Sequence, residues 1–235
     1  MSEAPKDPHD RLFLDTFSNV ENATSLIRAM LPESIVEHLD FESLSPSTKH
    51  FVDEKLQRFE SDLLFTVRLS DGREGLIYCL VAHQSTNDNL MSFRELRYMV
   101  RIWDAWLREA RSKAEKSKNP PPKKLPPIIP LLLSHAEGGW RAPVRFSSIL
   151  DGPDSLLEAL GSHVPDFELV LMDLKEVSDE ELERLKLRSI VRLALLLFKH
   201  GRDRRAPFRG RLLTWTTLVG QVLQADGVEA LVRIM

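Results

Sequence analysis

Two apolar segments joined by a turn decide the fold of this chain. They read Asp62-Leu63-Leu64-Phe65-Thr66-Val67-Arg68-Leu69 and Leu76-Ile77-Tyr78-Cys79-Leu80-Val81. Short runs rich in apolar and β-branched residues are typical of strands, and Asp71-Gly72 between them predicts a hairpin. Because apolar residues occupy consecutive positions, we expect both strands to be buried on both faces of a sheet.

The length of the turn decides which residues face each other across this hairpin. With a three-residue loop, Asp71-Gly72-Arg73, position 62 lies opposite position 82, and position 84 falls on the same face because side chains alternate. With a two-residue loop, position 62 faces position 81 instead. Acids at 62 and 82 with a polar residue at 84 would form a magnesium and water-activation site. Position 84 is Gln84, but position 82 is Ala82, so the chemical pattern is incomplete.

Helical patterns precede and follow the hairpin. Apolar residues recur at intervals of three and four from His9 to Asp40. Ser18-Asn19 is expected to break the pattern or cap a second helix, Pro32 to open a third short helix, and residues 41–61 read as irregular. The clearest helix runs from Met91 to about Glu115. We expect its inward face to be the apolar stripe Phe93, Leu96, Val100, Trp103, Leu107 and Ala110.

The second half of the chain adds two strand patterns and several helices. Strands are predicted at 128–133 and at 167–172, with a helix around 156–160 between them. The first is a buried-strand candidate that Pro130 would make an edge or a bulge unless its missing N–H faces away from a partner strand. One helix is predicted to start at Ser178 and run to Phe198, followed by helical pieces at 212–223 and 228–235. This order predicts a mixed α/β protein.

We expect residues 1–175 to form one domain and residues 176–235 a helical C-terminal region. That region would either pack on the same core or mediate self-association as a homodimer. The residues considered for a two-fold interface are Leu193, Leu197, Trp215 and Leu218, for which an intrachain core is at least an equal alternative.

Composition excludes several classes of protein. With 235 residues, 43% of them hydrophobic, the chain can bury a substantial core. Its single cysteine, Cys79, excludes an intramolecular disulfide and a multi-cysteine metal site. Without a phosphate-binding glycine loop, no nucleotide cofactor is expected. No signal peptide is visible, and the longest apolar run, Leu193 to Phe198, is far too short for a bilayer, so we expect a cytoplasmic protein without a membrane partner.

The net charge of −3 conceals a strong segregation of charge. Residues 1–62 hold thirteen acids and six bases, whereas residues 91–124 hold ten bases and four acids. Residues 199–211 hold six bases and one acid. Basic segments of this kind point to a polyanionic partner, although solvated helix surfaces produce them too.

Several stretches, in order, resemble the recombination-promoting nuclease and transposase family of the PD-(D/E)XK nuclease superfamily. They lie mainly within residues 8–145 and are Pro8-His9-Asp10 with Phe13 and Phe17-Ser18, Phe51-Val52-Asp53-Glu54, Ser61-Asp62-Leu63-Leu64, Asp71-Gly72-Arg73-Glu74, His83-Gln84-Ser85-Thr86, Arg97-Tyr98-Met99 with Trp103, Leu125-Pro126-Pro127-Ile128-Ile129-Pro130, and Ser134-His135 with Trp140.

The resemblance implies a mixed sheet flanked by helices, with a cleft that cuts DNA with Mg²⁺ or Mn²⁺. It makes Asp62 a metal ligand and places Gln84 where the superfamily has its lysine. Asp10 becomes a plausible further ligand. Arg94, Arg97 and Arg101 would bind DNA phosphates beside the cleft.

The chain departs from the family pattern at Ala82, where the second catalytic glutamate is expected. An alanine methyl supplies neither charge nor a coordinating oxygen, so activity should fall by orders of magnitude, by analogy with losses of about 10²–10³ at other sites. Either the substitution was introduced to inactivate the site, or the activity has decayed naturally. Glu60 and Glu74 are considered as substitutes. The alternative function is a non-catalytic DNA-binding or interaction module that keeps the nuclease fold.

Overall fold

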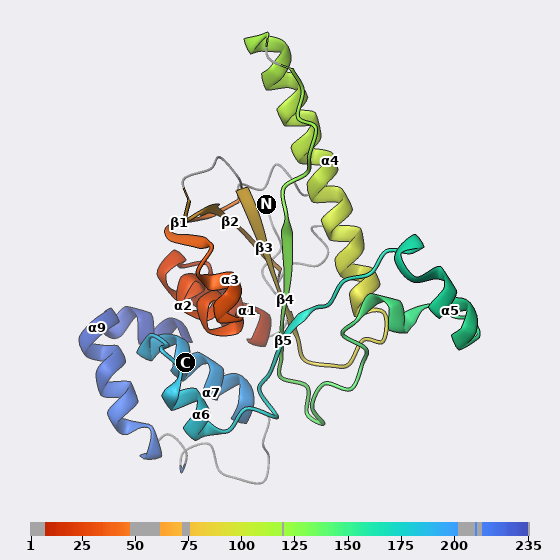
Figure 1. Cartoon of the computed structure of the whole chain (residues 1–235). Coiled ribbons are helices and arrows are strands. Elements are labelled where there is room, and N and C mark those ends of the chain that lie inside the picture. The colour runs from red at the N-terminus through yellow and green to blue at the C-terminus, as the bar shows by residue number, and fades with distance from the viewer. Residues whose placement is uncertain are drawn as a thin grey trace.

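A mixed five-stranded sheet organises the computed structural model, which describes residues 8–47, 62–71, 76–118, 120–201, 210 and 213–234, with the backbone alone for 76–80. The strands follow chain order across the sheet (Figure 1). They are β1 (Leu39–Pro46), β2 (Leu63–Leu69), β3 (Leu76–Gln84), β4 (Ile128–Ser134) and β5 (Val170–Asp173). The pairs β1–β2 and β2–β3 are antiparallel, whereas β3–β4 and β4–β5 are parallel.

Helices cover both faces of this sheet. The first half of the chain contains α1 (Pro8–Phe17), α2 (Val20–Met30), α3 (Glu33–Val36) and the long α4 (Met91–Ser117). Short 3₁₀ turns, η2 (Phe146–Ile149) and η3 (Gly161–His163), lie on either side of α5 (Asp154–Leu160). The remaining helices are α6 (Asp179–Arg184), α7 (Ser189–His200) and α9 (Thr216–Ile234), and Gly227 interrupts α9 with a φ of 82°. No helix among these described residues is long and apolar enough to cross a membrane.

The core is divided by the sheet. One face carries a large apolar cluster in which Phe65, Val81 and Leu133 pack with residues of α1, α2, α7 and α9. The opposite face packs against α4, where Leu64 and Ile128 contact one cluster and Leu132 another. The alternation of side chains along each strand separates these two sets. This architecture is the mixed α/β fold that the order of elements predicts, and it is consistent with the PD-(D/E)XK-like core that the family resemblance implies.

The C-terminal helices pack on the same core as the sheet. Leu193 and Leu197 of α7 are buried in the large cluster, as are Trp215 and Leu218. These four residues therefore occupy the intrachain core, which was the alternative to a two-fold interface. Self-association and the domain boundary at residue 175 remain predictions.

Two predictions about the strands and helices were wrong, and the expectation for Pro130 is met through its stated exception. Residues 41–46, predicted to be irregular, belong to β1, which begins at Leu39 within the segment predicted to be helical. β4 lies between β3 and β5, as expected of a buried strand, and β5 pairs with it only from Leu131 onward, so that Pro130 has no β5 neighbour on that side, which is the exception allowed for this proline. The helix expected from Ser178 to Phe198 is two helices, although its capping box at Ser178 and Glu181 is present.

The predicted inward face of α4 was also wrong. The buried side chains are Met91, Ser92, Glu95, Tyr98, Met99, Ile102, Ala105 and Ala114. Two members of the expected apolar stripe, Phe93 and Val100, are each 45% exposed. Both series have helical spacing, so periodicity did not distinguish them, and packing on Leu64 and Ile128 selects the face that carries Met99 and Ile102.

Adjacent residues of α4 test this orientation. We expect Met99→Ala to lower the free energy of unfolding by about 2–4 kcal/mol, because it removes a buried side chain and leaves a cavity. Val100→Ala should change it by less than about 0.5 kcal/mol, because Val100 is half exposed. Urea unfolding monitored by circular dichroism measures both values. Equal losses would contradict the orientation of α4.

Candidate functional site

The register of β2 and β3 places Asp62 opposite Ala82. Leu63 pairs with Val81 and Leu64 with Leu80, and the next position along β2 therefore faces position 82. This is the register predicted for a three-residue loop; the turn itself, with Glu74, lies outside the described residues, as does Glu60. Because side chains alternate, Asp62, Ala82 and Gln84 share the face of the sheet that α4 covers. Leu64 confirms this orientation, since it packs with Tyr98 and Ile102 of α4.

Asp62 is held in a half-buried setting between the sheet and α4. Burial raises the pKa of its carboxyl group to about 6. The nearby Arg94 guanidinium and hydrogen bonds from the Tyr98 hydroxyl and the His83 backbone N–H lower this pKa, while the charge of Asp10 raises it. Desolvation raises the pKa of Asp62 by more than Arg94, Tyr98 and His83 lower it. Such a shift is common for carboxylates at functional sites.

A second carboxylate, Glu95, approaches Asp62 from α4. The Glu95 side chain is 1% exposed, and neither of its carboxylate oxygens has a hydrogen-bond partner among the described residues. Burial raises its pKa well above the ordinary value, the charge of Asp62 raises it further, and Arg94 lowers it. The structure therefore brings two acids and one arginine together.

The remaining predicted site residues on β3 lie next to this group. Ala82 is fully buried and packs with Met91, Leu132 and Leu169. Gln84 is half-buried two residues further along β3, in register with Ser134 of β4. Its amide nitrogen donates to the carbonyl oxygen of His83 at 2.7 Å. Position 82 is thus occupied by a methyl group on the floor of the site.

Asp10 reaches the site from the opposite face of the sheet. Its carboxylate lies 3.4 Å from Nδ1 of His83. The hydrogen bond with His83 holds the pKa of Asp10 below its usual value, and burial opposes this shift. His83 in turn stacks on His135, with 2.7 Å between their Nε2 atoms, so one ring nitrogen donates and the other accepts. Asp10 therefore raises the pKa of Asp62 by its charge, while its own carboxylate interacts with His83.

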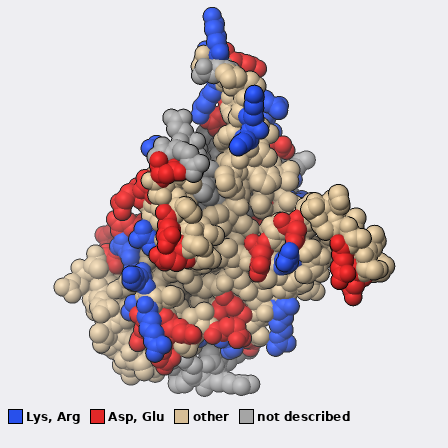
Figure 2. All heavy atoms as spheres, viewed as in Figure 1, with Lys and Arg blue, Asp and Glu red and all other residues tan. Residues whose placement is uncertain are grey.

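The three arginines predicted to bind phosphate differ in their surroundings. Arg94 is largely buried and forms an ion pair with Asp88 at 3.3 Å. Its positive charge lowers the pKa of both Asp62 and Glu95. Arg97 is exposed, whereas Arg101 is half-buried with an Nη1 atom that has no partner among the described residues. Further basic side chains gather along the outer part of α4, at the top of Figure 2; they include Arg108, Arg111, Lys113, Lys116 and Lys118.

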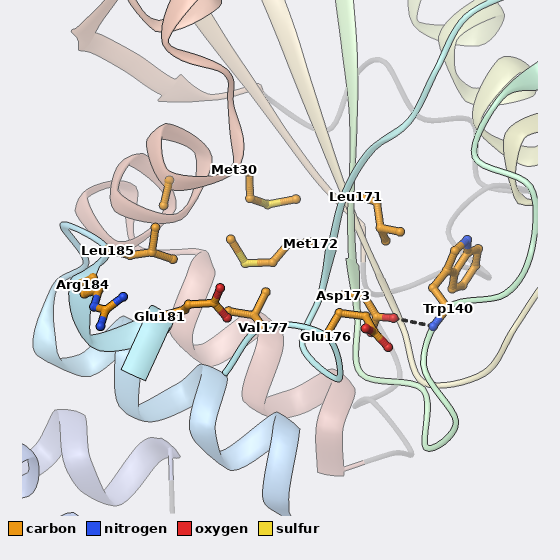
Figure 3. A pocket seen from close by; sticks show the side chains of 11 residues that line it. Met30, Trp140, Leu171, Met172, Asp173, Glu176, Val177, Glu181, Arg184 and Leu185 are labelled. Atoms are coloured by element: carbon orange, nitrogen blue, oxygen red, sulfur yellow. Dashed lines mark hydrogen bonds between the residues drawn. The ribbon is translucent and has the colours of Figure 1, made fainter. Parts of the chain in front are cut away.

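A separate pocket of about 660 Å³ lies at the β5 edge of the sheet (Figure 3). Met30, Met172 and Leu185 supply apolar walls, and Glu176 and Arg184 are charged residues of the lining. Asp173 points toward Trp140, whose backbone N–H it accepts at 2.5 Å. Two strands, β3 and β4, separate this pocket from Asp62, so it is not part of the acidic site.

Sequence reasoning missed Glu95 and the Tyr98 contact with Asp62, and it assigned no role to His83. The available signal was the spacing Met91, Glu95, Tyr98 and Ile102, which places one acid in an otherwise buried helical series. Within the described residues, no group of three or more histidine, cysteine, aspartate or glutamate side chains is arranged to hold a metal ion. Any cation here would rely on the paired carboxylates together with water or substrate oxygens.

Comparison with known proteins gives related sequences over most of the chain. Residues 7–226 match the family described as "Putative transposase, YhgA-like". Recombination-promoting nuclease RpnD of Escherichia coli O157:H7 is 32% identical over 201 residues, which cover 84% of this chain and 69% of that protein. No solved structure matches.

Two further relatives come from Escherichia coli strain K12. The inactive recombination-promoting nuclease-like protein RpnE is 30% identical over 84% of this chain and 60% of its own length. Recombination-promoting nuclease RpnA is 29% identical over 84% of this chain and 61% of its own length. The chain therefore spans only about three fifths of each of these two relatives. With the family model covering nearly all of its residues, the chain belongs to the YhgA-like transposase family, together with the recombination-promoting nucleases.

Proposed function

We propose that this chain is a divalent-cation-dependent DNA endonuclease whose site is centred on Asp62 and Gln84, with a rate lowered by Ala82. The observation that supports this most directly is the β2–β3 register, which puts Asp62, position 82 and Gln84 on one face of the sheet. The relatives named as nucleases support the reaction class, and the one named inactive shows that related chains differ in activity.

The residues present fit a hard cation such as Mg²⁺ or Mn²⁺. Asp62 and Glu95 are oxygen donors, and Mg²⁺ in phosphate chemistry usually keeps several waters and takes only one or two carboxylates. The cation would polarise the scissile phosphate and lower the pKa of a bound water. Gln84 would position that water or the phosphate, and Arg94 would offset negative charge beside it.

The basic surface of α4 favours a polyanionic substrate. Arg97 is exposed one turn after Arg94, and the basic side chains of the outer part of α4 continue in the same direction along the helix. Lysine and arginine contacts to phosphates add affinity without sequence selection. Double-stranded DNA bound along α4 would bring its backbone toward Asp62.

Cleavage of supercoiled plasmid in Mg²⁺ tests the catalytic proposal. We expect slow nicking by the wild type and at least about a hundredfold slower nicking by Asp62→Asn, because a carboxylate that binds the cation is lost. Agarose gels over a time course measure both rates, and EDTA should abolish cutting by the wild type. Equal rates for the two proteins would reject Asp62 as the centre.

The alternative, a DNA-binding module without catalysis, predicts a different pair of results. Neither protein would cut, and both would bind DNA in EDTA with a strong dependence on salt. The burial of Ala82 among Met91, Leu132 and Leu169 is the observation that favours this alternative, since the side chain at position 82 packs on apolar residues and supplies no oxygen ligand.

DNA binding along α4 is tested by its salt dependence. We expect Arg97→Ala to reduce the slope of log K against log salt by about 1, because one phosphate contact is lost. Arg184→Ala, an exposed arginine on α6, should leave the slope unchanged. Fluorescence anisotropy with a labelled duplex in EDTA measures the slopes. A loss with Arg184→Ala and none with Arg97→Ala would place the DNA elsewhere.

The raised pKa of Asp62 predicts a pH-dependent stability in metal-free solution. Between the ordinary value of 3.8 and about 6, the folded protein holds this proton more tightly than the unfolded chain. Stability contributed by the protonated carboxyl is therefore lost as pH rises through this window.

Asp62→Asn removes that loss. In EDTA we expect its Tm to exceed that of the wild type at about pH 8, with a smaller difference at about pH 4. Differential scanning calorimetry at the two pH values measures this. A difference that does not depend on pH would mean that Asp62 titrates normally.

A further inference from the structure

We propose that Glu95 supplies, from α4, the second carboxylate of the cation site that Asp62 opens, in place of the side chain that Ala82 lacks. This inference rests on the proposed function and names the residue that allows the site to bind a cation despite the alanine. It assigns a ligand role to a helix residue that lies outside the strand pattern of the hairpin.

The packing around Ala82 indicates which part of α4 lies over position 82. Met91 of α4 contacts Ala82 in a fully buried cluster with Leu132. Glu95 follows Met91 by four residues, so it lies one helical turn further along the same buried face. Position 82 faces Asp62 across the hairpin. The charge of Asp62 acts on the carboxylate of Glu95, so the two acids lie near each other beside position 82.

The lack of hydrogen bonds to Glu95 favours a role as a cation ligand over a purely structural role. Buried carboxylates that only stabilise a fold are paired or hydrogen-bonded, because an unsatisfied buried polar group is costly. Both oxygens of Glu95 lack a hydrogen-bond partner among the described residues, although the side chain is 1% exposed. Its neighbours on the buried face, Met99 and Ile102, show that an apolar residue suits this surface. Burial without hydrogen-bond partners, next to a second carboxylate, is what we expect of a carboxylate that serves as a cation ligand.

Arg94 explains how two acids are tolerated together without a metal. Its guanidinium acts electrostatically on both Asp62 and Glu95, and Asp88 holds it at 3.3 Å. A single arginine offsets part of the charge of two carboxylates and satisfies none of the hydrogen bonds of Glu95. A divalent ion would complete the neutralisation, with waters or phosphate oxygens in its remaining positions.

Binding of Mn²⁺ to the full chain, followed by the electron paramagnetic resonance signal of the free ion, tests the inference without reference to activity. We expect the wild type to bind one Mn²⁺ and both Asp62→Asn and Glu95→Gln to bind it at least tenfold more weakly. Glu109→Gln, which changes an exposed acid on the same helix, should match the wild type.

The outcomes separate this inference from the proposed function. If Glu95→Gln binds Mn²⁺ like the wild type while Asp62→Asn does not, Glu95 is not a ligand, and the proposed cation site at Asp62 is retained. If the wild type shows no Mn²⁺ site, both the inference and the cation-dependent function fall.

Exchange of the two positions provides a second test that does not depend on Glu95→Gln alone. We expect Glu95→Leu to lose Mn²⁺ binding and to melt at a higher temperature than the wild type in EDTA, because an unsatisfied buried acid is replaced by an apolar side chain. The double variant Ala82→Glu with Glu95→Leu should bind Mn²⁺ at least tenfold more tightly than Glu95→Leu alone. A lower Tm for Glu95→Leu with unchanged Mn²⁺ binding would instead assign Glu95 a structural role.

Discussion

The antiparallel register of β2 and β3 is the constraint on which the site depends. It sets Asp62 against position 82 and turns both, with Gln84, toward α4. A shift of one residue would turn the strand's side chains to the opposite face and move Asp62 toward α1 and α7. The burial of Phe65 and Val67 in the large cluster, and of Leu64 against Tyr98, holds this register on both faces at once.

The long helix α4 combines two tasks that compete for the same residues. Its inner face must fill the space over the sheet, and Met91, Met99 and Ile102 do so. The same face carries Glu95 and Tyr98 toward Asp62, and Arg94 stands at its margin. The apolar side chains of Phe93 and Val100 remain exposed. Glu95 is an acid on a face that otherwise packs with apolar residues, and it lies next to a second acid, Asp62. Functional residues are expected to reduce stability at positions of this kind.

Local pattern predicted many individual elements because their signals lie within a few residues. The Asn19 cap of α2, the capping box at Ser178 and the two apolar strands of the hairpin are cases of this kind. Elements whose state depends on distant partners were predicted less well. β1 forms because β2 offers it an edge, and Pro130 is accepted in a central strand because β5 is short. Neither reason is visible in the residues concerned.

By itself, the amino-acid sequence determined the mixed α/β class and the hairpin. It also determined the resemblance of its ordered motifs to the recombination-promoting nucleases, and the presence of the neutral Ala82 where that family has an acid. These follow from side-chain period, turn chemistry and residue identity. Only the tertiary structure decided which face of α4 meets the sheet, and with it the placement of Glu95 beside Asp62. Two helical stripes had acceptable spacing, and the choice between them rests on packing against Leu64 and Ile128, which belong to strands distant in the chain.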